Sequence, residues 1–134
     1  MRRLRWLPVV VAGLVVPVSG CSSGAADRCE EAFTAVTMSV DGVASASWDC
    51  SDQFGGGWQR GDVVIEASDE DGAIEVMDAI LRAYAASPDL EDRWSVPQEF
   101  KTRDRSIIVS AGDLGFNGPP KLREVREHYG VTPG

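Results

Sequence analysis

The first element that the hydrophobic pattern predicts is a helix near residue 27. Apolar residues recur every three or four positions there, as they do along one face of a helix. This stripe consists of Cys29, Phe33, Val36 and Val40. Asp27 and Glu30 have the spacing of a capping box, and Gly42 is a residue type that ends helices. We therefore expect a helix between Asp27 and Gly42.

A β-hairpin is predicted next. Residues 43–50 alternate between small or apolar and polar side chains, which is typical of a half-buried strand. The face expected to be buried carries Ala44, Ala46, Trp48 and Cys50. Residues 61–67 form a second run, rich in valine and isoleucine, and the glycine-rich residues 51–57 lie between the two runs. This arrangement predicts a hairpin with a long loop.

Helical spacing returns after the hairpin. Residues 68–71 are Ser-Asp-Glu-Asp, which suits the start of a helix because acids are favourable at its positive end. The helix is expected to run to Ala86, before Pro88. Its expected buried stripe is Ile74, Met77, Ile80 or Leu81, and Tyr84.

The last part of the chain predicts two further strands and a helix. We expect strands at residues 99–102 and 106–111, and the continuous apolar run 107–109 favours a central or well-covered position for the second. The last helix is marked by Leu122, Val125 and Tyr129. Gly130 is expected to close it.

The expected order of elements is αββαββα. This order predicts an α+β two-layer sandwich, in which helices pack on a mainly antiparallel four-stranded sheet. The chain has 134 residues, of which 43% are hydrophobic and 25% charged, and this length and composition suit one globular domain.

The first 20 residues have a different character. Three arginines, at positions 2, 3 and 5, precede the apolar residues 6–18 and two small residues. As a helix, the apolar run would span about 20 Å, whereas a membrane core is about 30 Å thick. Residues 1–20 are therefore interpreted as a secretory signal peptide.

The sequence Val-Ser-Gly-Cys at residues 18–21 resembles the lipobox of bacterial lipoproteins, with Val18 where that family more often has leucine. The resemblance implies that Cys21 carries a diacylglyceryl group, that the signal is cut before it, and that acyl chains such as palmitate anchor the chain. A plain secretory signal cut elsewhere is the alternative.

The same resemblance implies an organisation and a location. Residues 21–26 would be a lipidated flexible tether and residues 27–134 a single α+β domain on the extracytoplasmic face of the cell membrane. In order and size, the domain is also similar to small lipoproteins of actinobacteria, and 11 arginines against two lysines suit a GC-rich genome.

The two other cysteines, Cys29 and Cys50, are expected to form a disulfide, which persists outside the cytoplasm. The alternative is a metal site. It would need further ligands, but the single histidine, His128, is far away in the sequence and no CxxC motif occurs.

The charge limits the partners. The chain has 13 basic and 21 acidic residues and a net charge of −8, which argues against nucleic acid. Loss of the three arginines with the signal peptide leaves −11. We therefore expect anionic headgroups to repel the domain, with the lipid on Cys21 as its contact with the membrane.

Catalytic motifs are lacking. The sequence has no GxSxG or SxxK motif, and its single histidine is expected to lie on the surface near the end of the last helix. The acids at residues 69–71 lack the later ligands of an EF-hand. We expect no enzyme and no cofactor. A small carboxylate-dependent hydrolase is a less favoured alternative.

Phe54 and Trp58 flank the three glycines at residues 55–57 and are candidates for contact with a partner, although such side chains also often cover a sheet edge. The sequence thus predicts a lipid-anchored cell-envelope protein with a structural or binding role. The alternative is an accessory subunit that binds an envelope protein through residues 54–58.

Overall fold

The computed structural model describes residues 24–52 and 57–134. The expected signal peptide, Cys21 and Phe54 lie outside these residues. The elements are α1 (Gly24–Met38), β1 (Val43–Ser51), β2 (Trp58–Ile65), α2 (Glu70–Ala86), β3 (Phe100–Lys101), β4 (Ile108–Val109), the 3-10 helix η2 (Ala111–Leu114) and α3 (Leu122–Tyr129). The predicted order is confirmed, and η2 is an addition to it.

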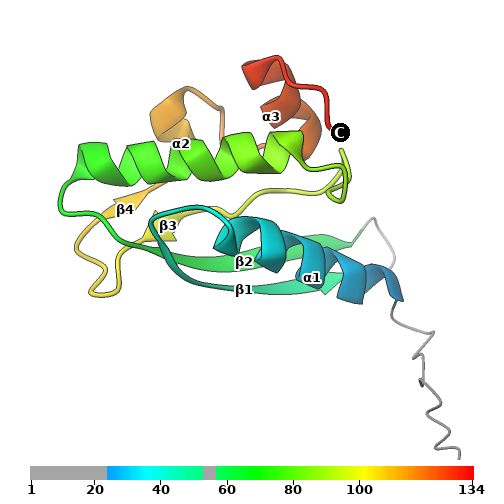
Figure 1. The fold of residues 1–134 in the computed structure, drawn as a ribbon, viewed down its shortest axis with the longest axis horizontal. Helices are drawn as coiled ribbons and strands as arrows, with labels where there is room; N and C mark the ends of the chain where they lie inside the picture. Colours follow the sequence, from blue (N-terminus) through cyan, green and yellow to red (C-terminus); the bar gives the residue numbers. More distant parts are fainter. Residues whose placement is uncertain (1–23, 53–56) are drawn as a thin grey trace, which may run out of the picture.

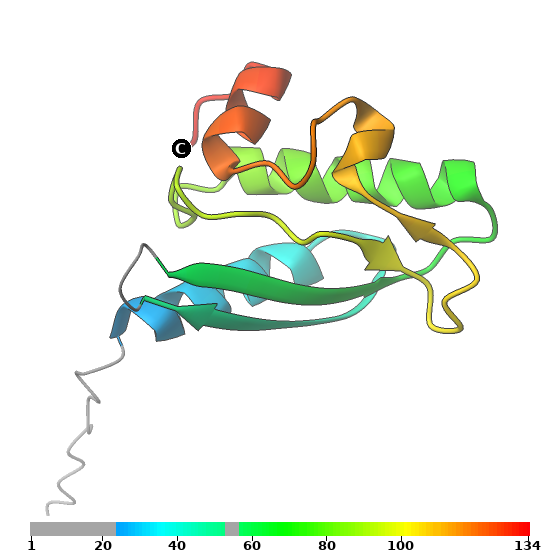
Figure 2. The ribbon, with the colours of Figure 1, turned by 180° about the vertical axis from the view of Figure 1, so that it is seen from behind.

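The helices α1 and α2 cover one face of a four-stranded sheet, so the predicted α+β architecture is confirmed (Figure 1). From behind, β1 and β2 lie in front of these helices, and their outer face is uncovered (Figure 2). The sheet order is β1-β2-β3-β4. The sheet is mixed, because β2 and β3 are parallel while the two other pairs are antiparallel. Parallel pairing needs a crossover, and α2 provides it.

The strands β3 and β4 are shorter than expected and have two residues each. The expectation that the second of them is central or well covered is wrong, since β4 is the last strand in the sheet order. Val109 faces the core, but Ile108 is 44% exposed. The apolar run at residues 107–109 was therefore misleading, because alternate residues of a strand point to opposite faces.

Four aromatic rings form the centre of the core. Phe33 of α1 stacks on Trp48 of β1, with ring centroids 3.9 Å apart, and meets the Tyr84 ring edge to face at 5.3 Å. The Trp94 ring lies 5.7 Å from Phe33. The Tyr84 hydroxyl lies 2.6 Å from Thr37 Oγ1, so its polar atom is paired although the side chain is buried. The prediction that Trp48, Met77 and Tyr84 are core residues is confirmed.

The predicted disulfide between Cys29 and Cys50 is confirmed and joins α1 to β1. The helix begins at Gly24, inside the segment expected to be a flexible tether. Glu30 was expected to form a capping box, but its Oε2 accepts a hydrogen bond of 2.9 Å from the backbone N–H of Cys50. A covalent bond and a hydrogen bond therefore fix the same end of β1 to α1.

The buried guanidinium of Arg126 joins α3 to the end of α2. It is 8% exposed and donates hydrogen bonds to the carbonyl oxygens of Ala85, Ser87 and Leu90 at 3.1, 2.7 and 2.7 Å. The last turn of α2 has no basic residue of its own. Arg126 therefore supplies the positive charge and the donors that the carbonyl groups at a helix end require.

Candidate functional site

A groove opens where β2 and the segment that leads into β3 separate. The parallel ladder pairs Val63 with Phe100 and Val64 with Lys101. Continued toward the start of β2, this register would place Pro97 beside Arg60. Proline has no N–H to donate, so it interrupts a ladder.

Other contacts hold the segment away from β2 at this point. Ser95 forms an isolated bridge with Lys121, and the backbone N–H of Val96 donates to the carbonyl of Pro120 at 3.1 Å. The backbone N–H of Ser95 donates to Oε1 of the Gln59 side chain at 2.8 Å. A side chain of β2 thus replaces the backbone acceptor that a continuous ladder would have used.

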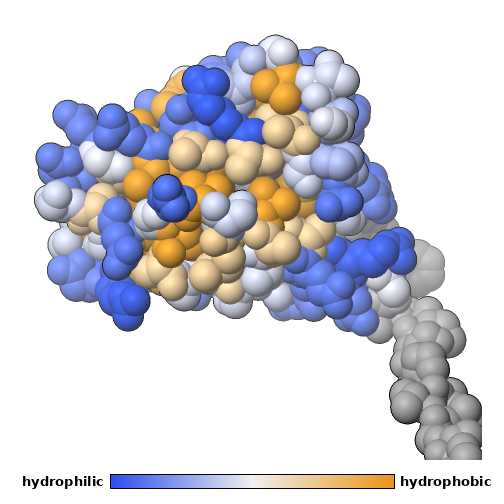
Figure 3. Space-filling view, in the orientation of Figure 1, coloured by the Kyte–Doolittle hydropathy of each residue, from blue (hydrophilic) through white to orange (hydrophobic). Residues whose placement is uncertain are grey.

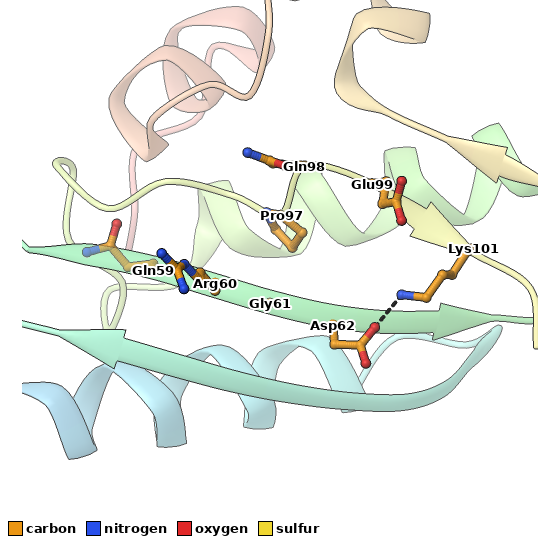
Figure 4. A pocket seen from close by; sticks show the side chains of 8 residues that line it. All are labelled: Gln59, Arg60, Gly61, Asp62, Pro97, Gln98, Glu99 and Lys101. Atoms are coloured by element: carbon orange, nitrogen blue, oxygen red, sulfur yellow. Dashed lines mark hydrogen bonds and ion pairs between the residues drawn. The ribbon is translucent and has the colours of Figure 1, made fainter.

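Two adjoining hollows make up this feature, which we call the β2 groove. The Pro97 hollow has a volume of about 420 Å³ and is lined by Gln59, Arg60, Gly61, Asp62, Pro97, Gln98, Glu99 and Lys101 (Figure 4). The Trp58 hollow has a volume of about 370 Å³ and is lined by Gly57, Trp58, Gln59, Arg60, Arg93, Ser95, Val96, Gln98, Pro119 and Lys121. Both volumes fall in the range of small-molecule sites, about 300 to 1,000 Å³.

The two hollows differ in charge. In the Pro97 hollow, the carboxylate of Asp62 forms an ion pair with Lys101 (Figure 4). An oxygen of the Glu99 carboxylate lies 3.5 Å from a guanidinium nitrogen of Arg105. The Trp58 hollow is lined by three basic residues, Arg60, Arg93 and Lys121, and by no acidic residue. A concave positive site therefore lies on a chain whose net charge is −8.

Trp58 holds one of these cations in place. The guanidinium carbon of Arg60 lies 4.2 Å from the centroid of the Trp58 ring, which is the geometry of a cation–π contact. Trp58, one of the two candidates for contact with a partner, is 37% exposed. Phe54, its expected companion, lies outside the described residues.

The basic residues of the groove were not recognised in the sequence. Arg60 lies on β2 and Lys101 on β3, whereas Arg93 and Lys121 lie outside the helices and strands. The positions are far apart in the chain, and only the folding of residues 93–99 beside β2 brings them together. One feature of the sequence could have indicated the groove. The chain has two lysines, Lys101 and Lys121, and both line it.

A second surface feature is apolar. Figure 3 shows a patch of hydrophobic residues on the face that carries α1 and α2, between the two helices. Partly buried residues of this region pack against the core, among them Val36, Val40, Ile74 and Val76. A Cβ atom on Gly42 would lie 2.8 Å from Val76, so the turn after α1 is tightly packed on α2. This patch is therefore largely the outer surface of the contact between the two helices.

The carboxyl groups with a shifted pKa do not suit acid catalysis. Burial opposes ionisation of Asp78, but hydrogen bonds from Tyr129 and Arg82 outweigh it and lower the pKa. The backbone and hydroxyl of Ser106, with Thr102, lower the pKa of Asp104. A general acid at neutral pH needs a raised pKa, so neither group has the property required of a hydrolase acid.

His128 is exposed at the end of α3, as expected. Its ring packs against those of Phe116 and Tyr129, with centroids 4.3 and 4.8 Å away. Within residues 24–52 and 57–134, no group of three or more His, Cys, Asp or Glu residues has the arrangement of a metal site. In the same part of the chain, no helix has the length and apolar character of a membrane span.

Comparison of the chain with models of protein families, with curated proteins and with solved structures gives no significant match.

Proposed function

We propose that the protein is a lipid-anchored lipoprotein of the cell envelope and that its domain is a non-enzymatic binding module. Cys21 is the lipidated residue in this proposal, and the domain lies on the extracytoplasmic side of the membrane. The β2 groove is the surface that binds the ligand or partner.

The use of the three cysteines carries this proposal. Cys29 and Cys50 form a disulfide, which is typical of proteins outside the cytoplasm. Cys21 is the remaining cysteine and directly follows the basic, apolar and small residues of a lipoprotein signal. One acyl chain holds a protein only marginally at a membrane, whereas two or three hold it stably. The helix α1 begins at Gly24, which keeps the domain close to such an anchor.

The shape and charge of the β2 groove support a binding role. Its hollows have the volume of ligand sites, and it gathers basic groups beside an exposed tryptophan. Two side chains of types that act in hydrolases, by contrast, have other roles in the fold. His128 packs against aromatic rings, and Asp78 is paired with Tyr129 and Arg82.

The alternative function is that of an accessory subunit that binds an envelope protein through residues 54–58. The exposure of Trp58 favours it, because tryptophan is enriched among the residues that dominate interface energies. In this alternative the β2 groove accepts part of a protein surface instead of a small ligand.

The proposal is tested by substitution of the lipidated residue. Cys21→Ala should move the protein from the membrane to the soluble fraction when cells are fractionated, because its acyl chains are lost. Ser22→Ala, the adjacent matched control, should remain in the membrane. The disulfide, detected by a mobility shift on reduction, should form in both variants and so verify export.

Mass spectrometry of the wild-type protein supplies a second measurement. The first residue should be Cys21 and should carry a diacylglyceryl group. An unmodified chain that begins elsewhere, or a Cys21→Ala variant that remains in the membrane, would contradict the proposal.

A further inference from the structure

We propose that the Trp58 hollow of the β2 groove binds a phosphoryl group, in the form of a phosphate ester. This inference names the ligand class of the binding module proposed above and therefore rests on that proposed function. It does not depend on the lipid at Cys21.

The arrangement of charge is the first argument. Arg60, Arg93 and Lys121 line one concave surface without an acidic residue, in a chain with 21 acidic residues. Three cations that converge on a single hollow repel one another, and an anion that bridges them relieves this repulsion. A phosphate monoester carries about −1.5 to −2 charge and three terminal acceptor oxygens, which is more than a carboxylate offers, so it is the better match for three cations.

The position of the Arg60 guanidinium is the second argument. The contact places the guanidinium carbon 4.2 Å from the ring centroid, and the N–H donors of Arg60 that do not face the ring are available to a ligand. Arginine recognises phosphate with two such N–H groups in parallel, and a guanidinium already held by stacking loses less entropy on binding. Trp58 is thus a positioning residue for Arg60.

The ion pair between Arg93 and Glu91 does not prevent Arg93 from binding a phosphate. Arg93 Nε lies 2.8 Å from Glu91 Oε1, but the two side chains are 59% and 45% exposed. An exposed ion pair of this kind is worth little, so a phosphate can compete for Arg93. Gln98 also lines the hollow and can donate a hydrogen bond from its side-chain amide.

The place of the hollow in the domain suggests two sources of phosphate. Arg93 and Gln59 also line a small adjoining hollow with Ala25 and Ala26, at the start of α1. Figure 2 shows this start of α1 at the same end of the molecule as the start of β2. In an anchored protein that end is nearest the membrane, so the phosphate belongs either to a lipid headgroup or to a soluble ester.

The overall charge of −11 does not oppose a headgroup contact at this site. Exposed charges are screened beyond a Debye length of about 10 Å, so the nearest charges dominate. The expectation that anionic headgroups repel the domain concerns the net charge of the whole molecule, and the Trp58 hollow is a local exception to it in this proposal.

The test uses the full mature protein in lipid nanodiscs and follows the NMR signals of the Trp58 indole N–H and the Arg60 side-chain N–H. One set of nanodiscs contains phosphatidylcholine, and the other also contains phosphatidylglycerol. Glycerol 3-phosphate is the soluble probe, and glucuronate is the carboxylate control. If the source is soluble, glycerol 3-phosphate shifts both signals in either nanodisc. If the source is a headgroup, phosphatidylglycerol shifts them without any added probe.

Variants assign the effect to the hollow. The double variant Arg60→Gln, Lys121→Gln should weaken phosphate binding by at least about fivefold, because charge-assisted hydrogen bonds are lost. The control double variant Arg103→Gln, Arg123→Gln removes the same two positive charges from exposed residues outside the hollow, and should change binding by less than about twofold. An unchanged backbone spectrum verifies the fold of both variants.

Three results would overturn the inference. They are the absence of a shift with both phosphate sources, equal shifts with glucuronate and glycerol 3-phosphate, and equal weakening in the hollow double variant and in Arg103→Gln, Arg123→Gln. Each leaves the result of the Cys21→Ala fractionation unchanged. Release of the lipid anchor and loss of phosphate binding are therefore separate failures.

Discussion

The stability of the domain should depend strongly on Arg126, a residue of α3 with no role in the proposed site. Its guanidinium donates to the carbonyl oxygens of Ala85, Ser87 and Leu90. We propose Arg126→Met as the perturbation. Methionine preserves most of the length of the side chain and its fit to the apolar surroundings, but it offers no donor and no charge.

The magnitude follows from these hydrogen bonds. A hydrogen bond to a charged group contributes about 1.5 to 3 kcal/mol, and an acceptor left without a partner in a buried place costs about 1 to 3 kcal/mol. The three bonds are not additive, because they share one guanidinium and water will reach some of the oxygens. The ion pair with Asp92 adds little, since that carboxylate is 60% exposed. We therefore expect a loss of about 3 to 5 kcal/mol from a total near 5 to 15 kcal/mol.

Urea unfolding followed by circular dichroism measures this loss. With a slope of about 2 kcal/mol per M, the midpoint should fall by about 2 M. Arg123→Met is the matched control, because Arg123 lies on the same helix, has the same charge and is exposed. It should change the free energy of unfolding by less than about 0.5 kcal/mol.

A third variant separates charge from geometry. Arg126→Lys keeps the positive charge near the end of α2 but has no planar fork, so its stability should lie between those of the wild type and Arg126→Met. The reasoning is refuted if Arg126→Met and Arg123→Met differ by less than about 1 kcal/mol. Water would then satisfy the carbonyl groups as well as Arg126 does.

Three other predictions concern the core. Replacement of Cys29 and Cys50 by serine should reduce the free energy of unfolding by about 3 kcal/mol, because the disulfide closes a loop of 21 residues; an unchanged urea midpoint would contradict this. Gly61→Ala should reduce the free energy of unfolding by about 1 to 3 kcal/mol, since the added Cβ would lie 2.6 Å from the Trp48 ring. A melting temperature equal to that of the wild type would contradict this and would show that the ring moves freely. Burial raises the pKa of Tyr84 above its usual value of 10.0, so the contribution of this residue to stability should be constant below pH 10 and fall above it. Tyr84→Phe should therefore show a smaller alkaline fall of stability in urea titrations.

The candidate site was only partly accessible from the sequence. Trp58 was a candidate for partner contact because it flanks the glycines of the hairpin loop, and it lines the groove. Arg60, Arg93 and Lys121 were not recognised as a group. Their juxtaposition depends on the bridge between Ser95 and Lys121 and on the interruption of the ladder at Pro97. These are long-range contacts, and local patterns do not encode them.

The position of Arg126 in the sequence indicates that its side chain is buried, but this signal was overlooked. It follows Leu122 by four positions and therefore lies on the same face of α3 as the apolar residues. A charged residue on an apolar face indicates a buried partner, since burial of an unpaired charge is costly. The identity of that partner, the end of α2, depends on how the two helices pack.

Local chemistry was sufficient for the elements of this protein. The order αββαββα was predicted from helical spacing, strand alternation, the acidic start of α2 and the glycine after α3. The same patterns predicted that Trp48 and Tyr84 are buried. These features could be recognised because each acts over a few residues. The tertiary structure alone decided the parallel pairing of β2 with β3, the edge position of β4, the cap provided by Arg126 and the positive hollow beside Trp58. Each of these depends on which distant segments come to lie side by side, and that is determined by the packing of the whole chain around one core.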